Sequence, residues 1–288
     1  MESTQPKQRV NPLTSLMRQP KIYIKLPSNG RFWSPNSLDM SPNGEYAVYS
    51  MTARDELLLK TPDALMNGQA VVDVIQNCIP AIKNAWEVPS IDLDVVLIAI
   101  RLATYGEMME TAFKIGDEEM NYNVDLRKLL DSLYETITWD ERINIGTDLA
   151  LYITPVKYSL ISKTSIQNFE TQKIMSLVNN SELSEEQKID TFRESFRKLT
   201  DITVGIINNS VYRIESSAGT TELPEDIIEF MENCDKSVYD AVKDRLEKLR
   251  LSNTLKPIKV RASPEMIANG SEEEFEIPLT FDPANFFG

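Results

Sequence analysis

Recurrent prolines in the first 45 residues are the feature of this sequence that most restricts the backbone conformation of the chain. They stand at positions 6, 12, 20, 27, 35 and 42. Because proline lacks a backbone N–H and disfavours the helical conformation of the residue before it, no long helix fits between them. We therefore expect residues 1–45 to form an extended arm. Within it, Ile22–Leu26 alternates as a strand does, and Asn29-Gly30 is typical of a tight turn.

The arm is basic, whereas the chain as a whole is acidic. Residues 1–38 carry six Lys and Arg and one Glu, while the complete chain has 30 Lys and Arg against 44 Asp and Glu and a net charge of −14. Opposite charges favour docking. The arm is therefore expected either to reach another protein or to lie back on its own acidic body, and the sequence leaves both alternatives open.

Residues 46–160 carry the signals of a helical domain with one β-hairpin. Thr52 followed by Asp55 indicates a helix start, with Thr52 as the N-cap. A second helix is expected from Ser90 to Gly106; it is apolar nearly all round, which predicts the central buried helix. Alternation with period two on both sides of Gly116-Asp117 predicts an antiparallel hairpin.

Residues 161–288 read as a long-helix region that ends in a small hairpin and a tail. Ser184 and Gln187 form a capping-box pattern, and apolar residues then recur at steps of three or four as far as Ile206. Further helices are expected at about residues 165–178, from Pro224 to Asn233, and along the apolar stripe from Val238 to Leu249. Two alternating segments, at residues 258–260 and 275–281, predict the last hairpin.

These patterns predict a mixed α+β fold that is mainly helical, with small antiparallel β-hairpins and an extended N-terminal arm. The expected parts are the basic arm (1–45), a helical domain with a β-hairpin (46–160) and the long-helix region with its hairpin and C-terminal tail (161–288). Strands and helices do not alternate as in βαβ units.

The sequence contains no histidine. This excludes Ser-His-Asp and Cys-His mechanisms and His-ligated metal sites. Cys78 and Cys234 stand apart without a Cys-x-x-Cys spacing, so we expect two buried free thiols in a reducing compartment. Glycine-rich phosphate loops are absent as well. We therefore expect no metal and no cofactor.

The acidic balance also bears on partners. A strongly acidic body opposes binding to nucleic acid or to an anionic membrane. The longest apolar run, Val95 to Ile100, is far shorter than the roughly 20 residues of a membrane-spanning helix. Neither nucleic acid nor membrane is an expected partner, and the basic N-terminus does not read as a signal peptide.

Pairs of carboxylates are the only candidates for catalysis. Asp92/Asp94, Glu118/Glu119 and Glu272–Glu274 lie at a helix start or in turns, where acids are common for structural reasons. A carboxylate-based hydrolase of cell-wall glycan stays a weak alternative, since it needs two carboxyl groups across a cleft.

Arg101 lies inside the apolar helix and needs a partner, for which Asp94, two turns away, is a candidate.

Several segments resemble a known family. They are Leu26–Trp33, Tyr49–Glu56, Asp94–Arg101 with Tyr105-Gly106, and the ending Leu279–Gly288. Together they are similar to the baseplate hub and hub-assembly proteins of T-even-like (T4-type) contractile-tailed bacteriophages. The resemblance implies a structural protein of the phage tail rather than an enzyme.

The resemblance implies a central hub subunit that binds other baseplate and hub proteins during tail assembly. It further implies a late protein that assembles in the host cytoplasm and resides in the virion, in the tail baseplate. A hub-assembly chaperone that is absent from the mature virion is the alternative, and a homo-oligomer is left open.

The expected partner-binding residues combine the charges of the arm with aromatic anchors. Phe286 and Phe287 are included because adjacent aromatic side chains at a chain end are costly to leave in water; they are expected either to dock on the protein's own small β element or to insert into a neighbouring subunit. The candidate residues are Arg9, Arg18, Lys21, Lys25, Arg31, Trp33, Phe286 and Phe287.

Overall fold

The structure is a computed structural model that describes residues 13, 17–61, 68–115, 118–180, 184–261, 274–277 and 286. Its helices are α1 (Ala53–Leu59), α3 (Gln69–Cys78), the short 3₁₀ helix η2 (Ala85–Glu87), α4 (Ser90–Tyr105), α5 (Leu126–Thr136), α6 (Tyr158–Asn180), α7 (Glu185–Ser210), α8 (Pro224–Asn233) and α9 (Lys236–Asn253). Its strands are β1 (Ile22–Lys25), β2 (Glu45–Val48), β3 (Met108–Ile115), β4 (Glu118–Asp125), β5 (Arg142–Ile145), β6 (Leu149–Ile153), β7 (Val211–Ser216), β8 (Gly219–Thr221), β9 (Ile258–Arg261) and β10 (Glu274–Ile277).

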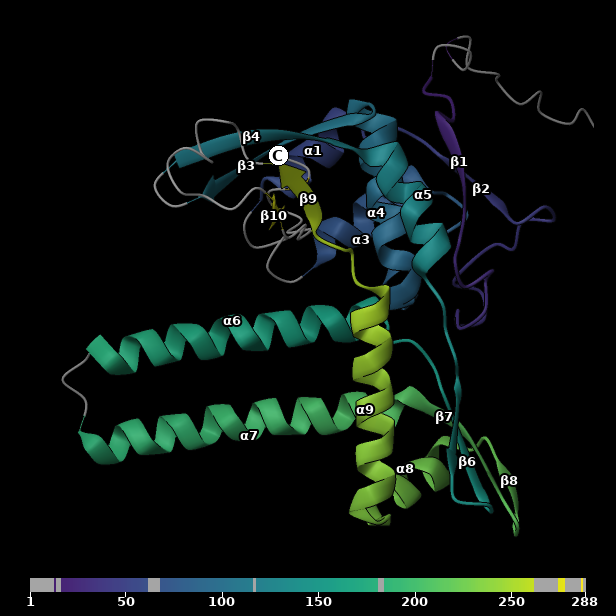
Figure 1. The fold of residues 1–288 in the computed structure, drawn as a ribbon, viewed down its shortest axis with the longest axis vertical. Coiled ribbons are helices and arrows are strands. Elements are labelled where there is room, and N and C mark those ends of the chain that lie inside the picture. The colour runs from purple at the N-terminus through teal and green to yellow at the C-terminus, as the bar shows by residue number, and fades with distance from the viewer. Residues whose placement is uncertain are drawn as a thin grey trace, which may run out of the picture.

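The predicted α+β class is confirmed. Three separate antiparallel hairpins, β1-β2, β3-β4 and β9-β10, accompany one four-stranded antiparallel sheet in the order β5-β6-β7-β8. The sheet was not predicted as such, since it joins β6 to β7 across the two long helices that separate them in sequence. The helices make up most of the ordered mass (Figure 1).

A first apolar cluster surrounds α4, which is the predicted central helix. Ten of its sixteen residues are buried, and α3, α5 and the β1-β2 hairpin pack around it. The helix ends at Gly106, whose φ of 92° suits glycine, as predicted. Leu255 and Phe286 from the C-terminal region complete this cluster.

A second cluster lies between the four-stranded sheet and the helices α8 and α9. Its buried members include Leu151 and Ile153 of β6, Ile227 of α8 and Val242 of α9. The predicted Pro224 helix start is confirmed, with the proline in the first turn of α8. Of the two cysteines, Cys78 is buried as expected, whereas Cys234 is only half-buried; both are free thiols.

Helices α6 and α7 form a long antiparallel hairpin that projects sideways from the body (Figure 1). The predicted capping box is present at the start of α7, where the Ser184 hydroxyl accepts the Gln187 N–H and the Gln187 side chain accepts the Ser184 N–H. Helix α6 starts at Tyr158, earlier than the expected residue 165. The Tyr158 N–H donates to the Val88 carbonyl, so a contact distant in sequence fixes this start.

The described part of the arm lies against its own chain. Arg18 donates to the carbonyls of Ser50 and Asn77, each at 2.6 Å. Further along, the Ser28 N–H and hydroxyl and the Trp33 indole Nε1–H all donate to the buried carboxylate of Asp92, at 2.8, 2.5 and 2.8 Å. Docking on the protein's own body is thus what the structure shows for this part of the arm.

The segment after β1 also reaches the second half of the chain. The predicted turn is confirmed, because Asn29 and Gly30 both have positive φ. Phe32 has a φ of 69°, which is strained for a bulky side chain. Its ring packs edge-on against Trp139 at 6.1 Å, and the neighbouring Arg31 pairs with Glu141 at 2.5 Å. The arm therefore links the α4 cluster to the start of the four-stranded sheet.

Asp94, the candidate partner of Arg101, does not pair with it among the described residues. The Arg101 guanidinium lies instead over the rings of Tyr105 and Phe286, at 5.2 Å from each centroid. Its buried Nε and Nη1 atoms find no hydrogen-bond acceptor within the described part of the chain. Asp94 lies two helical turns from Arg101, which is too far for an ion pair. The negative faces of the two aromatic rings stabilise the guanidinium charge instead.

Replacing Asp94 by asparagine is expected to raise the free energy of unfolding near pH 7 by about 1–3 kcal/mol and to leave it unchanged near pH 4. Burial raises the pKa of Asp94 to about 6. The folded state thus holds this proton more tightly than the unfolded chain, so the stability that it contributes is present at low pH and is lost as the pH rises through about 6.

Urea unfolding of both proteins between about pH 4 and pH 7.5 measures this difference. Asp73→Asn, at an exposed position of α3, is the matched control. Its free energy of unfolding should depend on pH in the same way as that of the wild type. An increase in the free energy of unfolding of Asp94→Asn that does not change with pH would contradict this explanation.

Candidate partner-binding surface

Strand β1 presents an exposed basic face with an aromatic centre. Alternation along the strand buries Ile24 and half-buries Ile22 against the α4 cluster, while Lys21, Tyr23 and Lys25 point outward. The Tyr23 side chain is 64% exposed. Neither lysine has an ion-pair partner among the described residues. This face therefore offers two free cations on either side of a phenol ring.

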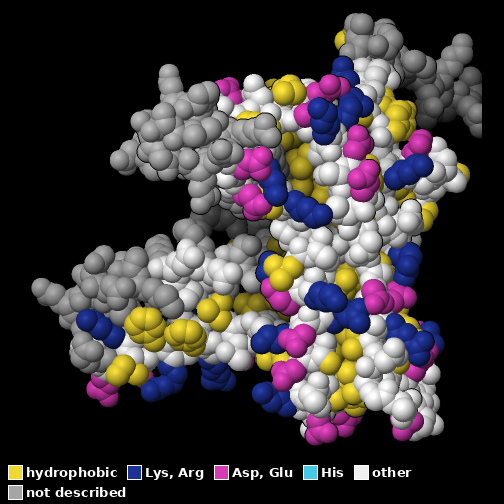
Figure 2. All heavy atoms as spheres, in the orientation of Figure 1, with side chains coloured by type: hydrophobic (Ala, Val, Ile, Leu, Met, Phe, Trp, Pro, Cys, Tyr) yellow, Lys and Arg dark blue, Asp and Glu magenta, His cyan; other side chains and the backbone are white. Residues whose placement is uncertain are grey.

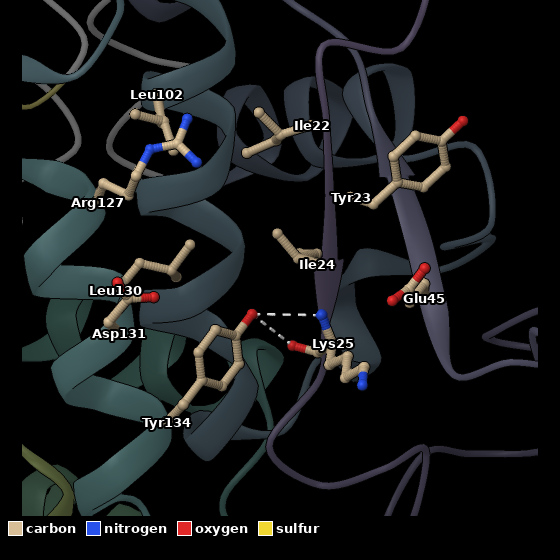
Figure 3. Close-up of a pocket in the computed structure, with 10 residues that line it drawn as sticks. All are labelled: Ile22, Tyr23, Ile24, Lys25, Glu45, Leu102, Arg127, Leu130, Asp131 and Tyr134. Carbon is tan, nitrogen blue, oxygen red and sulfur yellow. Dashed lines mark hydrogen bonds between the residues drawn. The ribbon is translucent and has the colours of Figure 1, made fainter.

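One edge of β1 pairs with β2, and the opposite edge faces α5 (Figure 3). At this second edge the Tyr134 hydroxyl of α5 accepts the Lys25 N–H at 3.2 Å and donates to the Lys25 carbonyl at 2.9 Å. Because backbone groups of alternate residues in a regular strand point to the same edge, we expect the N–H and carbonyl of Tyr23 to face α5 as well. Tyr134 thus completes the edge at Lys25, whereas no bond from α5 to the Tyr23 backbone occurs among the described residues.

A pocket of about 290 Å³ lies between this edge and α5. Leu102 and Leu130 give it an apolar wall, while Arg127 and Asp131 add opposite charges from α5 (Figure 3). Its volume is at the lower end of small-molecule sites, which span about 300–1,000 Å³. It suits a short stretch of peptide better than a large cofactor.

The groups at this surface are hydrogen-bonding and charged side chains beside an apolar wall. Burial raises the pKa of Tyr134 to about 12, so the hydroxyl keeps its proton at neutral pH and continues to donate to Lys25. Groups of three or more His, Cys, Asp or Glu that could hold a metal ion do not occur among the described residues. None of the helices in the described ranges is long and apolar enough to cross a membrane.

Of the predicted partner-binding residues that the structure describes, two lie at this surface. Lys21 and Lys25 are exposed here, whereas Arg18, Arg31 and Trp33 bond to the protein's own chain as described above. Trp33 is half-buried, and its hydrogen bond to Asp92 favours a structural role for it.

The remaining candidates lie at the chain ends. Phe286 is buried, with 4% of its side chain exposed, in the cluster around α4. Arg9 and Phe287 fall outside the described residues, as do the predicted turn at Gly116-Asp117 and residues 279–281 of the last predicted strand. A partner-binding role for these residues stays a prediction.

Sequence reasoning missed the α5 side of the surface. Tyr134 lies 109 residues from Lys25 in sequence, and nothing local marks its hydroxyl as a partner of the strand edge. The available signal was the amphipathic pattern of residues 126–136, which predicts a helix. The pattern does not predict which part of the fold Tyr134 and Arg127 of that helix contact.

Comparison with known protein families gives a match over most of the chain. Residues 19–262 match the family described as T4 bacteriophage base plate protein. No curated protein and no solved structure matches the chain. The matched range runs from the arm to the end of β9 and covers far more than half of the sequence, so this chain belongs to the T4 bacteriophage base plate protein family.

Proposed function

We propose that this protein is a central hub subunit of a contractile-tail baseplate and acts by binding other baseplate proteins. Membership of the baseplate family supports a structural role in the phage tail, in a family that is generally non-enzymatic. The observation that carries a binding mechanism is the open edge of β1, where the backbone groups of Tyr23 face an accessible pocket.

An extended segment of a baseplate partner is the proposed occupant of this edge. A strand that adds to a sheet edge gains main-chain hydrogen bonds, and side-chain pockets then select its sequence. The pocket beside α5 can accept one side chain of the incoming strand. Tyr134 limits the addition to the end of β1 near Tyr23.

Charge gives the chemistry of the partner. Lys21 and Lys25 flank the exposed Tyr23 and have no ion-pair partner among the residues described. An acidic or phenolic residue at alternate positions of the incoming strand would meet these cations. We therefore expect an acidic, extended segment whose binding weakens as salt rises, because exposed charges are screened over about 8 Å at physiological ionic strength.

Replacing Tyr23 by proline tests the edge directly. The Tyr23 N–H faces the pocket rather than β2, so proline removes a donor that the β1-β2 hairpin does not use. Expressed in cells infected with a phage that lacks this gene, Tyr23→Pro is expected to enter baseplate particles at least about tenfold less than wild type, since a lost edge bond and a blocked strand together cost more than about 1.4 kcal/mol.

Tyr23→Thr is the matched control, because threonine keeps the N–H and the strand propensity while it removes the ring. Quantitative mass spectrometry of isolated baseplates measures incorporation, and the melting temperature of each purified variant checks that the hairpin remains folded. Equal incorporation of the proline and threonine variants would rule out strand addition at this edge and leave the hub assignment to be judged separately.

A further inference from the structure

Helix α7 carries an apolar stripe that the α6–α7 hairpin does not cover. Ile189 and Phe196 are each 55% exposed, and Phe192 between them is half-buried. The rings of Phe192 and Phe196 stack with centroids 6.5 Å apart. Hydrophobic side chains are visible along the projecting hairpin in Figure 2, with Lys and Arg at its lower edge. An exposed isoleucine and an exposed aromatic residue along one helix mark an interaction surface.

The charges beside this stripe are basic, against the sign of the whole chain. From Lys188 to Lys198 there are four basic and two acidic residues, although the chain carries −14. Arg193 has an exposed ion pair with Asp190, which contributes little to stability. Arg197 is exposed, and no partner for it occurs among the described residues. An occupant of the stripe should therefore be acidic as well as apolar.

Helix α8 of the same chain has this complementary chemistry. Its inner face, with Ile227 and Met231, packs in the second cluster near the end of α7. Its outer face exposes Ile228 among glutamates, and no basic residue occurs anywhere in the helix. The glutamates on this outer face are Glu225, Glu229 and Glu232, all exposed.

We propose that the α7 stripe of one copy binds the outer face of α8 of a second copy. Within one chain the two surfaces do not meet, because α8 packs beside Ile207, which lies eleven residues, or about 16 Å of helix, beyond Phe196. The contact joins two different surfaces, so it adds copies head to tail. Such a series closes into a ring or continues as an open chain, depending on the rotation between neighbours.

The spacing of the residues supports this pairing. Arg193 and Arg197 are four residues apart, as are Glu225 and Glu229, so both pairs rise by about 6 Å along their helices. In sequence, Ile228 lies between Glu225 and Glu229. Phe196 lies between Arg193 and Arg197 at the same spacing. Two helices packed side by side can therefore match an apolar centre and a charged flank at the same time.

Sedimentation velocity of the full-length protein at several concentrations and salt levels tests the proposal. We expect concentration-dependent association that weakens with salt. Phe196→Ser in α7 and Glu229→Arg in α8 should each weaken it by at least about tenfold, as loss of a central anchor or of a charge pair does. Leu57→Ser and Arg54→Glu, at exposed positions of α1, are matched controls and should leave association unchanged.

Mixing the two variants gives the decisive result. A chain with the altered stripe still has an intact α8, and a chain with the altered α8 still has an intact stripe, so the mixture should form a 1:1 dimer that grows no further. Three results would each overturn the proposal: a wild type that stays monomeric at all concentrations, association that neither variant weakens, or a mixture that fails to form the dimer. A monomeric wild type would show that another protein covers the stripe.

Discussion

Replacing Asp92 by alanine is expected to lower the free energy of unfolding by about 3–5 kcal/mol and to release the arm from the body. The carboxylate is fully buried and accepts three hydrogen bonds, from the Ser28 N–H, the Ser28 hydroxyl and the Trp33 indole. Alanine leaves all three donors without an acceptor in a dry site, and each such loss costs about 1–3 kcal/mol. These bonds join residues about 60 positions apart, so their loss affects the tertiary fold rather than α4 alone.

Urea unfolding followed by tryptophan fluorescence measures this loss, and hydrogen exchange of residues 22–34 reports whether the arm is released. Asp73→Ala is the matched control at an exposed position, where the aspartate accepts a hydrogen bond from Gln69 on the same helix, and should cost less than about 1 kcal/mol. If Asp92→Ala loses as little unfolding free energy as the control, Asp92 does not hold the arm on the body.

Phe286→Ala is expected to destabilise the protein by about 3–5 kcal/mol, although only two residues follow it in the sequence. The ring is almost fully buried in the cluster around α4 and covers the Arg101 guanidinium at 5.2 Å. Its removal leaves a cavity and takes away one of the two aromatic faces over a charge that is costly to bury. Deletion of residues 284–288 should have at least the same effect on the melting temperature.

The exposed Phe196 supplies the control for this substitution. Phe196→Ala removes an equally large ring from α7, where 55% of the side chain already faces solvent, and should change the melting temperature little. Equal melting temperatures for Phe286→Ala and wild type would contradict docking of the tail on its own body and favour its insertion into a neighbouring subunit.

The sequence was sufficient where local chemistry decides the structure. The capping boxes at Thr52 and Ser184, the stop of α4 at Gly106 and the turn at Asn29-Gly30 all depend on residues within a few positions of each other. Their hydrogen bonds and positive φ angles are dictated by residue type. These elements were therefore predictable from the sequence.

Contacts between distant segments were not predictable in the same way. Tyr134 reaches the edge of β1, and Ser28 reaches Asp92, through pairings that only the complete fold defines. Helix spacing offered Asp94 as a candidate partner of Arg101, but it could not reveal the aromatic ring of Phe286, which arrives from the far end of the chain. The same reason explains why the basic arm was recognised while its docking on its own body was left open.

Quantitative mass spectrometry of purified virions shows whether this chain is a structural component of the baseplate. We predict that its peptides are present at a fixed integer ratio to the other baseplate proteins, and that they stay with the baseplate when tails are separated from heads. Virions with complete baseplates that lack these peptides would contradict a structural role and identify the protein as an assembly chaperone.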